Sequence, residues 1–176
     1  MLSIVPFMDV DFTSAVYPFP VFTMGQTNYR IYIIDTTTGE RCVWFLGTTL
    51  DSWTIMVPRS VWKLPWHRGK INFNCHFDPL SKCYQHYEMH TQSDWAPAQV
   101  YLTRPLAGFY YRRNGKLGNY RVWHDRLDVK QAKLESAQFG LLSRMNLVNE
   151  DEQQHPYSIL LQPINEFTIY LPPTAL

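Results

Sequence analysis

The sequence lacks the long apolar run that a membrane span requires, because no stretch approaches the ~20 consecutive apolar residues that cross a bilayer. Its first residues, MLSIVPFMDVDF, contain no basic segment followed by a long apolar core, and so do not resemble a secretory signal. Cysteine is sparse, with only Cys42, Cys75 and Cys83, and nothing in their spacing suits a disulfide framework. We therefore expect a cytoplasmic protein with reduced thiols and no membrane contact.

The chain contains few charged residues of either sign. Sixteen basic and fifteen acidic residues give a net charge of +1, and charged residues make up only 18% of the chain. Binding to a phosphate backbone needs a concentrated basic field, so we expect no nucleic-acid partner. The basic run YYRRNGK at 110–116 surrounds an Asn-Gly turn signal, which is typical of an exposed hairpin.

Short catalytic signatures are missing as well. The chain contains no GxSxG, HExxH or CxxC motif and no glycine-rich phosphate loop. His86, Glu88 and His90 would share one face of a strand, which leaves a metal site open as an alternative. We favour an exposed polar sheet face there, and expect neither a metal nor a cofactor.

The chain does contain many apolar and aromatic residues. Hydrophobic residues make up 45% of the sequence and aromatic residues 15%, which favours a compact fold rich in strands. A length of 176 residues suits a single domain over residues 1–176. A domain of this size buries enough surface to fold without staples.

Strand patterns pair into hairpins along the chain. Residues 29–35 and 41–47 flank the turn-like TTTGE, and residues 70–77 and 82–90 flank DPLS. Further strands are expected at 98–104, 108–113 and 117–125, and in the segments YSILLQP and EFTIYLPP near the end. In the first hairpin, strand alternation places Tyr29, Ile31 and Ile33 on one face and Arg30, Tyr32 and Ile34 on the other.

Two helices are expected. Asp51 or Ser52 caps a short helix that is interrupted near Val57 by Pro58 and ends at Leu64, before Pro65. A longer helix is expected over 128–145, where apolar residues lie roughly along one stripe. A mainly β chain with one short and one longer helix can protect its many strand edges in a closed or half-closed antiparallel barrel, whose mouth is a natural pocket.

Basic groups among apolar residues are the main candidates for function. Arg30 lies in an apolar strand and Arg59 lies close to tryptophans, and a buried guanidinium needs an anionic partner. That partner is either an internal carboxylate, such as Asp35 or Asp51, or the carboxylate of a bound ligand. His67 and His124 could act on a ligand as acid–base groups, or could simply hydrogen bond to a loop.

The order of several motifs resembles the domain-of-unknown-function family 2071, which is placed in the acetoacetate-decarboxylase-like superfamily. The segments that carry the resemblance are QTNYRIYI, GERCVWFLGT, VPRSVWKLPWHRGKI and the NGKL turn leading to VWHD, and they extend from about Phe22 to Pro172. The matching positions are Asn28, Arg30, Tyr32, Val43, Phe45, Arg59, Leu64, Pro65, His67 and His124. Gln26 stands where the family usually has glutamate, and Trp66 replaces a tyrosine.

The resemblance implies a cone-like β-barrel with an internal cavity. Acetoacetate decarboxylases use a lysine activated by a neighbouring cation, but this chain has no Lys-Lys pair, and Lys63 and Lys70 do not match that motif. We therefore expect a protein that binds a small anionic organic molecule, and the sequence leaves open whether it is an enzyme. Arg30 and Arg59 would contact the anion, with His124 beside them, Tyr32 and Trp66 would line the pocket, and His67 would be the acid–base group.

The alternative is a structural or interaction protein whose arginines are paired internally. Self-association into a homo-oligomer is compatible with either reading.

Overall fold

A computed structural model covers residues 1–176 and describes all of them except 14–18, 35, 37–38, 40, 94, 96–108, 112–116 and 176. Strands dominate the described chain, as the sequence predicts. The strand expected at 98–104 and most of the turn in YYRRNGK lie outside the described residues.

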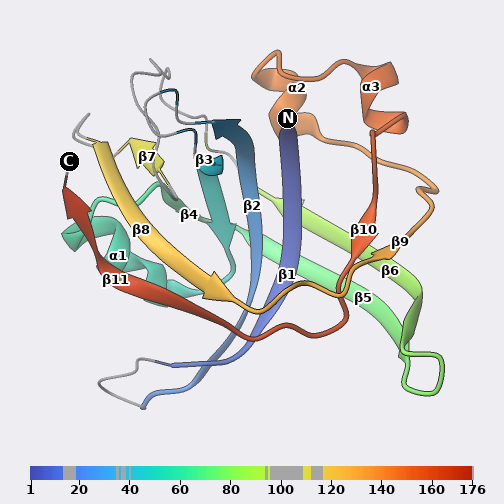
Figure 1. Ribbon diagram of the computed structural model, residues 1–176, viewed down its shortest axis with the longest axis horizontal. Helices are drawn as coiled ribbons and strands as arrows, with labels where there is room; N and C mark the ends of the chain where they lie inside the picture. Colours follow the sequence, from blue (N-terminus) through green and yellow to red (C-terminus); the bar gives the residue numbers. More distant parts are fainter. Residues whose placement is uncertain are drawn as a thin grey trace.

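One large sheet forms the centre of the protein (Figure 1). Its hydrogen-bonded order is β1-β2-β3-β7-β8-β11, and the short β4 pairs with β3 off this path. The strands are β1 (Leu2–Phe12), β2 (Phe22–Ile34), β3 (Arg41–Leu50), β4 (Trp66–Arg68), β7 (Phe109–Tyr111), β8 (Leu117–His124) and β11 (Phe167–Ala175). Neighbouring strands are antiparallel, except that β4 and β7 run parallel to β3.

Two smaller sheets and four short helices complete the described part of the chain. The hairpin of β5 (Lys70–Asp78) and β6 (Cys83–Gln92) confirms the second predicted hairpin, as β2 and β3 confirm the first. In its turn, the Asp78 carboxylate accepts hydrogen bonds from the backbone N–H of Leu80 and the hydroxyl of Ser81. The remaining elements are β9 (Lys130–Gln131), β10 (Leu160–Leu161), η1 (Trp53–Ile55), α1 (Met56–Val61), α2 (Gly140–Arg144) and α3 (Glu150–Gln154).

The central sheet buries apolar side chains on both faces, and each face has its own core. The outer face, which bears Tyr29 and Trp44, packs against Trp95 and against Leu141 and Leu142 of α2. The predicted alternation in β2 is confirmed, because Tyr29, Ile31 and Ile33 all contribute to this outer core. The β5–β6 hairpin lies on the same side, where Ile71 approaches Gly25 of β2.

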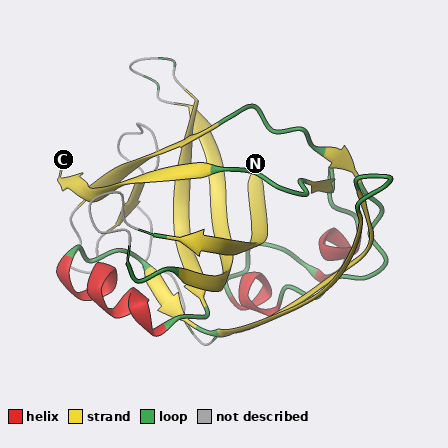
Figure 2. Ribbon diagram, turned by 90° about the horizontal axis from the view of Figure 1, so that it is seen from below, coloured by secondary structure: helices red, strands yellow, loops and turns green. Residues whose placement is uncertain are grey.

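The inner face is covered by the last strand of the same sheet and by the η1–α1 segment. Its core contains Met24, Phe45, Leu50, Ile55, Leu64 and Trp66, with Ile169 and Leu171 of β11 packed against it. The rings of Phe7 and Phe167 meet edge to face at 5.8 Å, so β11 reaches back over β1. The sheet is therefore curled, as Figure 2 shows from a second direction.

The expected barrel is not closed in the described part of the chain. The hydrogen-bonded path begins at β1 and ends at β11, so these two strands remain the edges of the sheet. Side-chain packing, with Phe7 against Phe167, takes the place of a final ladder between them. What the fold shows is a mainly β architecture with a curled central sheet.

The prediction of a long helix over 128–145 is wrong. Only Gly140–Arg144 is helical, while Lys130 and Gln131 pair with Leu161 and Leu160 and the Ala132 N–H donates to the carbonyl of Ile159. Pairing with a distant segment thus replaces the local helical hydrogen bonds that the composition favours. No helix in the described chain is both long and apolar enough to span a bilayer.

The first helical segment is close to its prediction. The Ser52 hydroxyl accepts a hydrogen bond from the Thr54 N–H and caps η1, and α1 follows directly. Pro58 lies in the first turn of α1, where a backbone N–H has no intrahelical partner to lose, so it does not kink the helix. The helix ends at Val61, three residues earlier than expected.

Candidate functional site

A row of polar side chains crosses the otherwise apolar inner face. Directly paired residues of neighbouring strands point to the same face, and Asp9 pairs with Met24 while Thr48 pairs with Asn28. Alternation along β2 adds every second residue from Met24 onward. We call this set the polar row, and its members are Asp9, Gln26, Asn28, Arg30, Tyr32 and Thr48.

The middle of the polar row is a buried and connected hydrogen-bond network. The side-chain amide of Gln26 donates to Asn28 Oδ1 at 2.9 Å, and the Thr48 hydroxyl donates to the same oxygen at 2.8 Å. All three side chains belong to buried residues. Because these side chains hydrogen bond to one another, the network ties β2 to β3 and holds the two strands in register.

Arg30 and Tyr32 form the end of the row that reaches the surface. Arg30 Nη2 donates a 2.7 Å hydrogen bond to the Tyr32 hydroxyl, and the guanidinium carbon lies 5.2 Å from the centre of the Tyr32 ring. The Nε atom of Arg30 is buried and has no hydrogen-bond partner among the described residues. Within the same part of the chain, no carboxylate lies within ion-pair distance of Arg30.

Asp9 forms the other end of the row. It is only 3% exposed, and neither carboxylate oxygen has a hydrogen-bond partner among the described residues. Burial raises the pKa of this carboxyl from 3.8 to about 7, because the charged form loses its hydration. Among the described residues, the polar row therefore has a buried N–H without an acceptor at one end and a buried carboxyl without a partner at the other.

The LPWHR segment sends its side chains to both faces of the sheet. Trp66 pairs with Thr48 and is buried in the inner core, on the side of the polar row. His67 pairs with Thr49 and lies on the outer face, where its ring stacks on Trp95 at 4.4 Å with an interplanar angle of 11°. Strand alternation thus separates His67 from Arg30, and the structure does not bring these two candidates together.

His67 belongs to a packed aromatic corner of the outer face. Trp95 Nε1 donates to the Thr49 hydroxyl at 2.9 Å, and its ring meets Tyr29 edge to face at 5.5 Å. Burial raises the pKa of Tyr29, while a hydrogen bond with Thr49 and the charge of Arg144 work in the opposite direction. These contacts describe a well-packed corner with a polar rim.

The remaining sequence candidates lie apart from the polar row. Arg59 is half-buried on α1, and Trp62, which directly follows this helix, packs against the inner core. Arg59 has no ion pair with a described residue. His124 ends β8, is exposed, and hydrogen bonds through Nδ1 to the carbonyl of Asp125 at 2.7 Å. Strand pairing therefore places Arg30, Tyr32 and Trp66 on the inner face and His67 on the outer face, while His124, which pairs with Phe167, is exposed at the end of β8.

The residues of the alternative metal site, His86, Glu88 and His90, lie close together but are exposed. Glu88 lies between His86 and His90, with N–O distances of 3.7 Å and 3.0 Å. The hydrogen bond from His90 is the main cause that lowers the pKa of Glu88, and one from Asn74 adds to it. Among the described residues, no group of three or more His, Cys, Asp or Glu is arranged to hold a metal ion.

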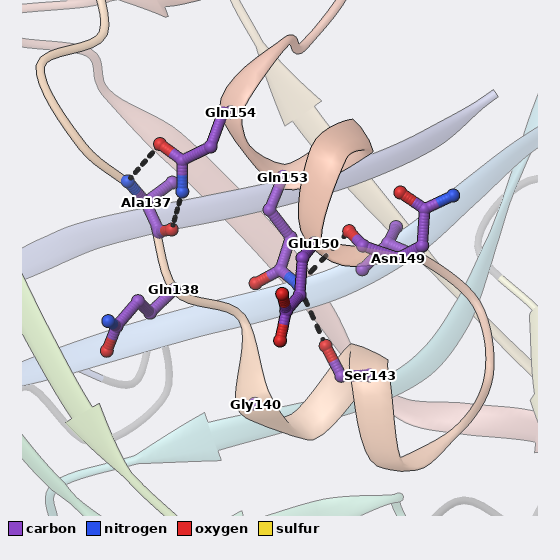
Figure 3. Close-up of a pocket in the computed structure, with 9 residues that line it drawn as sticks. Ala137, Gln138, Gly140, Ser143, Asn149, Glu150, Gln153 and Gln154 are labelled. Carbon is purple, nitrogen blue, oxygen red and sulfur yellow. Dashed lines mark hydrogen bonds between the residues drawn. The ribbon is translucent and has the colours of Figure 1, made fainter.

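A cleft between α2 and α3 is the second candidate, and Figure 3 shows its lining. The Gln153 amide donates to Ser143 Oγ and to the carbonyl of Asn149, and its oxygen accepts from the Phe139 N–H at 2.6 Å. Gln154 bonds to both backbone groups of Ala137. Because these polar groups serve the two helices, the cleft is a structural junction.

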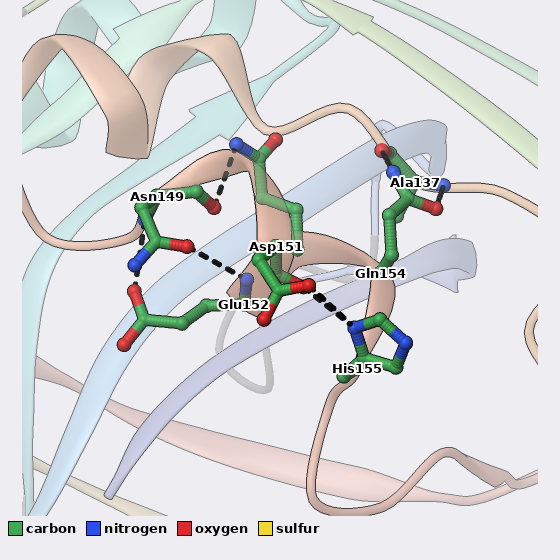
Figure 4. Close-up of polar contacts among 7 residues, drawn as sticks. Ala137, Asn149, Asp151, Glu152, Gln154 and His155 are labelled. Carbon is green, nitrogen blue, oxygen red and sulfur yellow. Dashed lines mark hydrogen bonds and ion pairs between the residues drawn. The ribbon is translucent and has the colours of Figure 1, made fainter.

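The start of α3 is fixed in the same way. Asn149 and Glu152 form a capping box, in which each side chain bonds to the other's backbone N–H at 2.8 Å (Figure 4). His155 lies 3.3 Å from the Asp151 carboxylate at the far end, with both side chains exposed. Neither contact is aimed at a ligand.

Sequence reasoning missed Asp9 and the centre of the polar row. The strand β1 was not expected, and without it Asp9 has no assigned face. A usable signal is present in LSIVPFMDVDF, because Val5, Phe7 and Asp9 alternate in phase and place a carboxyl on the same face as apolar residues.

The fold and the polar row together define a class, namely a mainly β protein whose curled sheet carries buried polar groups over an apolar core. A family model, DUF2071, described as an uncharacterized conserved protein, matches residues 1–163. The chain belongs to this family. No curated protein and no solved structure gives a significant match.

Proposed function

We propose that the protein binds a small anionic organic molecule at the Arg30 end of the polar row, in the cavity of a cone-like barrel of the acetoacetate-decarboxylase type. Arg30 is the anion contact, Tyr32 orients it, and Trp66 provides apolar surface deeper in the same face. Arg59, on the helix that covers this face, is a second positive charge for the ligand. The proposal is for binding and assigns no reaction, since the chain lacks the lysine pair of a Schiff-base decarboxylase.

The observation that carries the proposal is the unsatisfied Nε of Arg30. A buried N–H without a partner costs about 1–3 kcal/mol, and more when the group is charged. A ligand that accepts this hydrogen bond recovers that cost on binding. The neighbouring Nη2 is held by the Tyr32 hydroxyl, which fixes the guanidinium plane before the ligand arrives.

The geometry of arginine favours a planar anion. Its Nε and one Nη present parallel N–H groups, which match the two oxygens of a carboxylate. Lysine would supply the charge without this fork. A carboxylate is therefore favoured as the ligand, because one of its oxygens can accept a hydrogen bond from Nε while Nη2 remains bound to Tyr32.

The competing explanation is internal pairing of the arginines. Of the two acids suggested by the sequence, Asp51 is exposed and makes no ion pair with a described residue, while Asp35 lies outside the described residues. Among the described residues, the side-chain contacts of Arg30 are with Tyr32, a neutral partner that does not compensate its charge. This favours the ligand over the internal carboxylate.

Thermal stabilisation by a panel of small carboxylic acids tests the proposal. An acid present at about 100 times its Kd adds about 2.7 kcal/mol to the stability of the wild type. We expect Arg30→Ala to lose this response, Arg30→Lys to retain only part of it, and Arg59→Ala to weaken it. The measurement is the shift of the melting temperature with acid concentration at constant ionic strength.

Arg41→Ala is the matched control, because it removes the same charge from an exposed position on β3. This variant should respond to the acids as the wild type does. An equal response of the wild type, Arg30→Ala and Arg41→Ala would rule out the site.

A further inference from the structure

Asp9 lies where the regular pairing of β1 and β2 ends. Cross-strand partners run without interruption from Leu2 to Asp9, and the register then shifts before Phe12 pairs with Phe22. Asp11, inside this irregular stretch, has a positive φ of 55°. The buried carboxyl thus stands at the last regular rung, where the ladder is easiest to open.

The same point closes one end of the inner core. Met24, which pairs with Asp9, belongs to this core, and Phe12 packs against it from the irregular end of β1. On the other side, Phe7 contacts Phe167 at the start of β11. Movement of this end of β1 would therefore uncover the inner face that holds the polar row.

No charged group of the described residues compensates Asp9. On its own strand Asp11 is exposed, and Glu166 before β11 is exposed as well. From the segment over the inner face come Arg59 and Lys63, both half-buried, and β2 supplies Gln26 and, further along, Arg30. Within the described chain, none of these residues hydrogen bonds or ion-pairs with Asp9.

We propose that Asp9 is a proton switch, which holds this end of β1 against the inner core when it is neutral and releases it when it is ionised. Burial costs the neutral carboxyl less than the carboxylate, whose two acceptor oxygens have no donor among the described residues. Ionisation therefore favours a state in which Asp9 reaches solvent. This role requires no ligand and goes beyond the proposed binding.

The direction of the pH effect follows from linkage. Burial raises the pKa of Asp9 in the folded protein to about 7 from 3.8, so the folded state holds the proton more tightly than the unfolded state. The contribution to stability is complete below pH 3.8 and is lost as the pH rises through 7. Between pH 5.5 and 8.5, the two pKa values imply a rise in the unfolding constant of about 30-fold from this group alone.

Urea unfolding at pH 5.5 and 8.5 tests the switch. We expect the unfolding constant of the wild type to rise about 30-fold more over this range than that of Asp9→Asn, which cannot ionise. Asp11→Asn is the matched control, because it removes an exposed carboxyl two residues away, and it should follow the wild type. Equal pH dependence of the wild type and Asp9→Asn would overturn the proposal.

Two further measurements keep the test decisive if Asp9→Asn does not fold. The carboxyl carbon of Asp9, followed by NMR in the wild type, should titrate well above Asp11, and coincident titrations would contradict the switch. Release is read from the rate of proteolytic cleavage within residues 1–34 of the wild type at pH 5.5 and 8.5, corrected for the protease's own pH dependence on an unstructured peptide, with Asp11→Asn as the control. Faster cleavage at pH 8.5 in both proteins supports release, and equal corrected rates at the two pH values refute it.

Discussion

Gly47 sets the distance between the central sheet and Trp95. A β-carbon at this position would overlap the Trp95 ring, and that ring also stacks on His67 and hydrogen bonds to Thr49. The absence of a side chain at Gly47 therefore leaves room for Trp95 and for its contacts with His67 and Thr49 on the outer face. Trp95 is 8% exposed, so the ring has little room to retreat.

Gly47→Ala should destabilise the protein by about 1–3 kcal/mol, the usual cost of overpacking a well-filled core. Urea unfolding followed by tryptophan fluorescence measures it. Gly140→Ala is the control, since the nearest atom to its β-carbon would be Arg144 Nη1 at 3.7 Å, and alanine suits the helix α2. A loss at Gly140 as large as that at Gly47 would contradict the packing explanation.

Single residues also show what the sequence could reveal of the site. Alternation alone predicted that Arg30 and Tyr32 share a face, and the structure joins them by a hydrogen bond. Alternation could not assign His67 to a face of the sheet, because LPWHR was interpreted as the end of a helix. The segment instead contains the strand β4, which pairs with residues 48–50. Alternation in LSIVPFMDVDF could have placed Asp9 on an apolar face, but the depth of its burial also depends on strands that lie far away in the sequence.

Among the elements, α2 and α3 depend on one buried amide. Phe139 precedes α2 and offers no side-chain cap, but its N–H is bound by Gln153 of α3. The hairpins, by contrast, were predictable because DPLS and TTTGE contain their own turn chemistry. The helix expected over 128–145 failed because its true start is fixed by a residue fourteen positions away.

Gln153→Ala should cost about 1–3 kcal/mol, because it leaves the Phe139 N–H unsatisfied in a partly buried position. Loss of the same amide also frees the Ser143 hydroxyl. Gln138→Ala, an exposed glutamine of the same cleft, is the control and should change stability by less than about 0.5 kcal/mol. Similar losses in both variants, measured by urea unfolding, would show that the amide network does not join the helices.

For the protein as a unit, the predicted mainly β class is confirmed, whereas the predicted closed or half-closed barrel is not confirmed by the described strands. Many antiparallel strands predicted a barrel because closure removes exposed edges. The described chain reaches a related result by curling, so that β11 covers the inner face with its side chains while β1 and β11 remain unpaired with each other. Closure depends on the strand tilt and stagger of the entire sheet, which no local pattern specifies.

The curled arrangement predicts a sharp difference between adjacent residues of β11. Ile169 packs against the inner core, whereas Tyr170 points away and is 57% exposed. Ile169→Ala should therefore cost about 2 kcal/mol, near the low end for a buried isoleucine because its burial is partial. Tyr170→Ala removes a larger side chain but should cost less than about 0.5 kcal/mol.

Urea unfolding of the two variants measures this difference, and the transition of each should remain single because the inner core links β11 to β2 and β3. An uncurled sheet would leave Ile169 as exposed as Tyr170, and the two variants would then lose stability in proportion to side-chain size. The comparison of the two losses of stability therefore tests the curl. Only in a sheet that folds back over its own inner face does removal of the smaller side chain, Ile169, cost more stability than removal of the larger Tyr170.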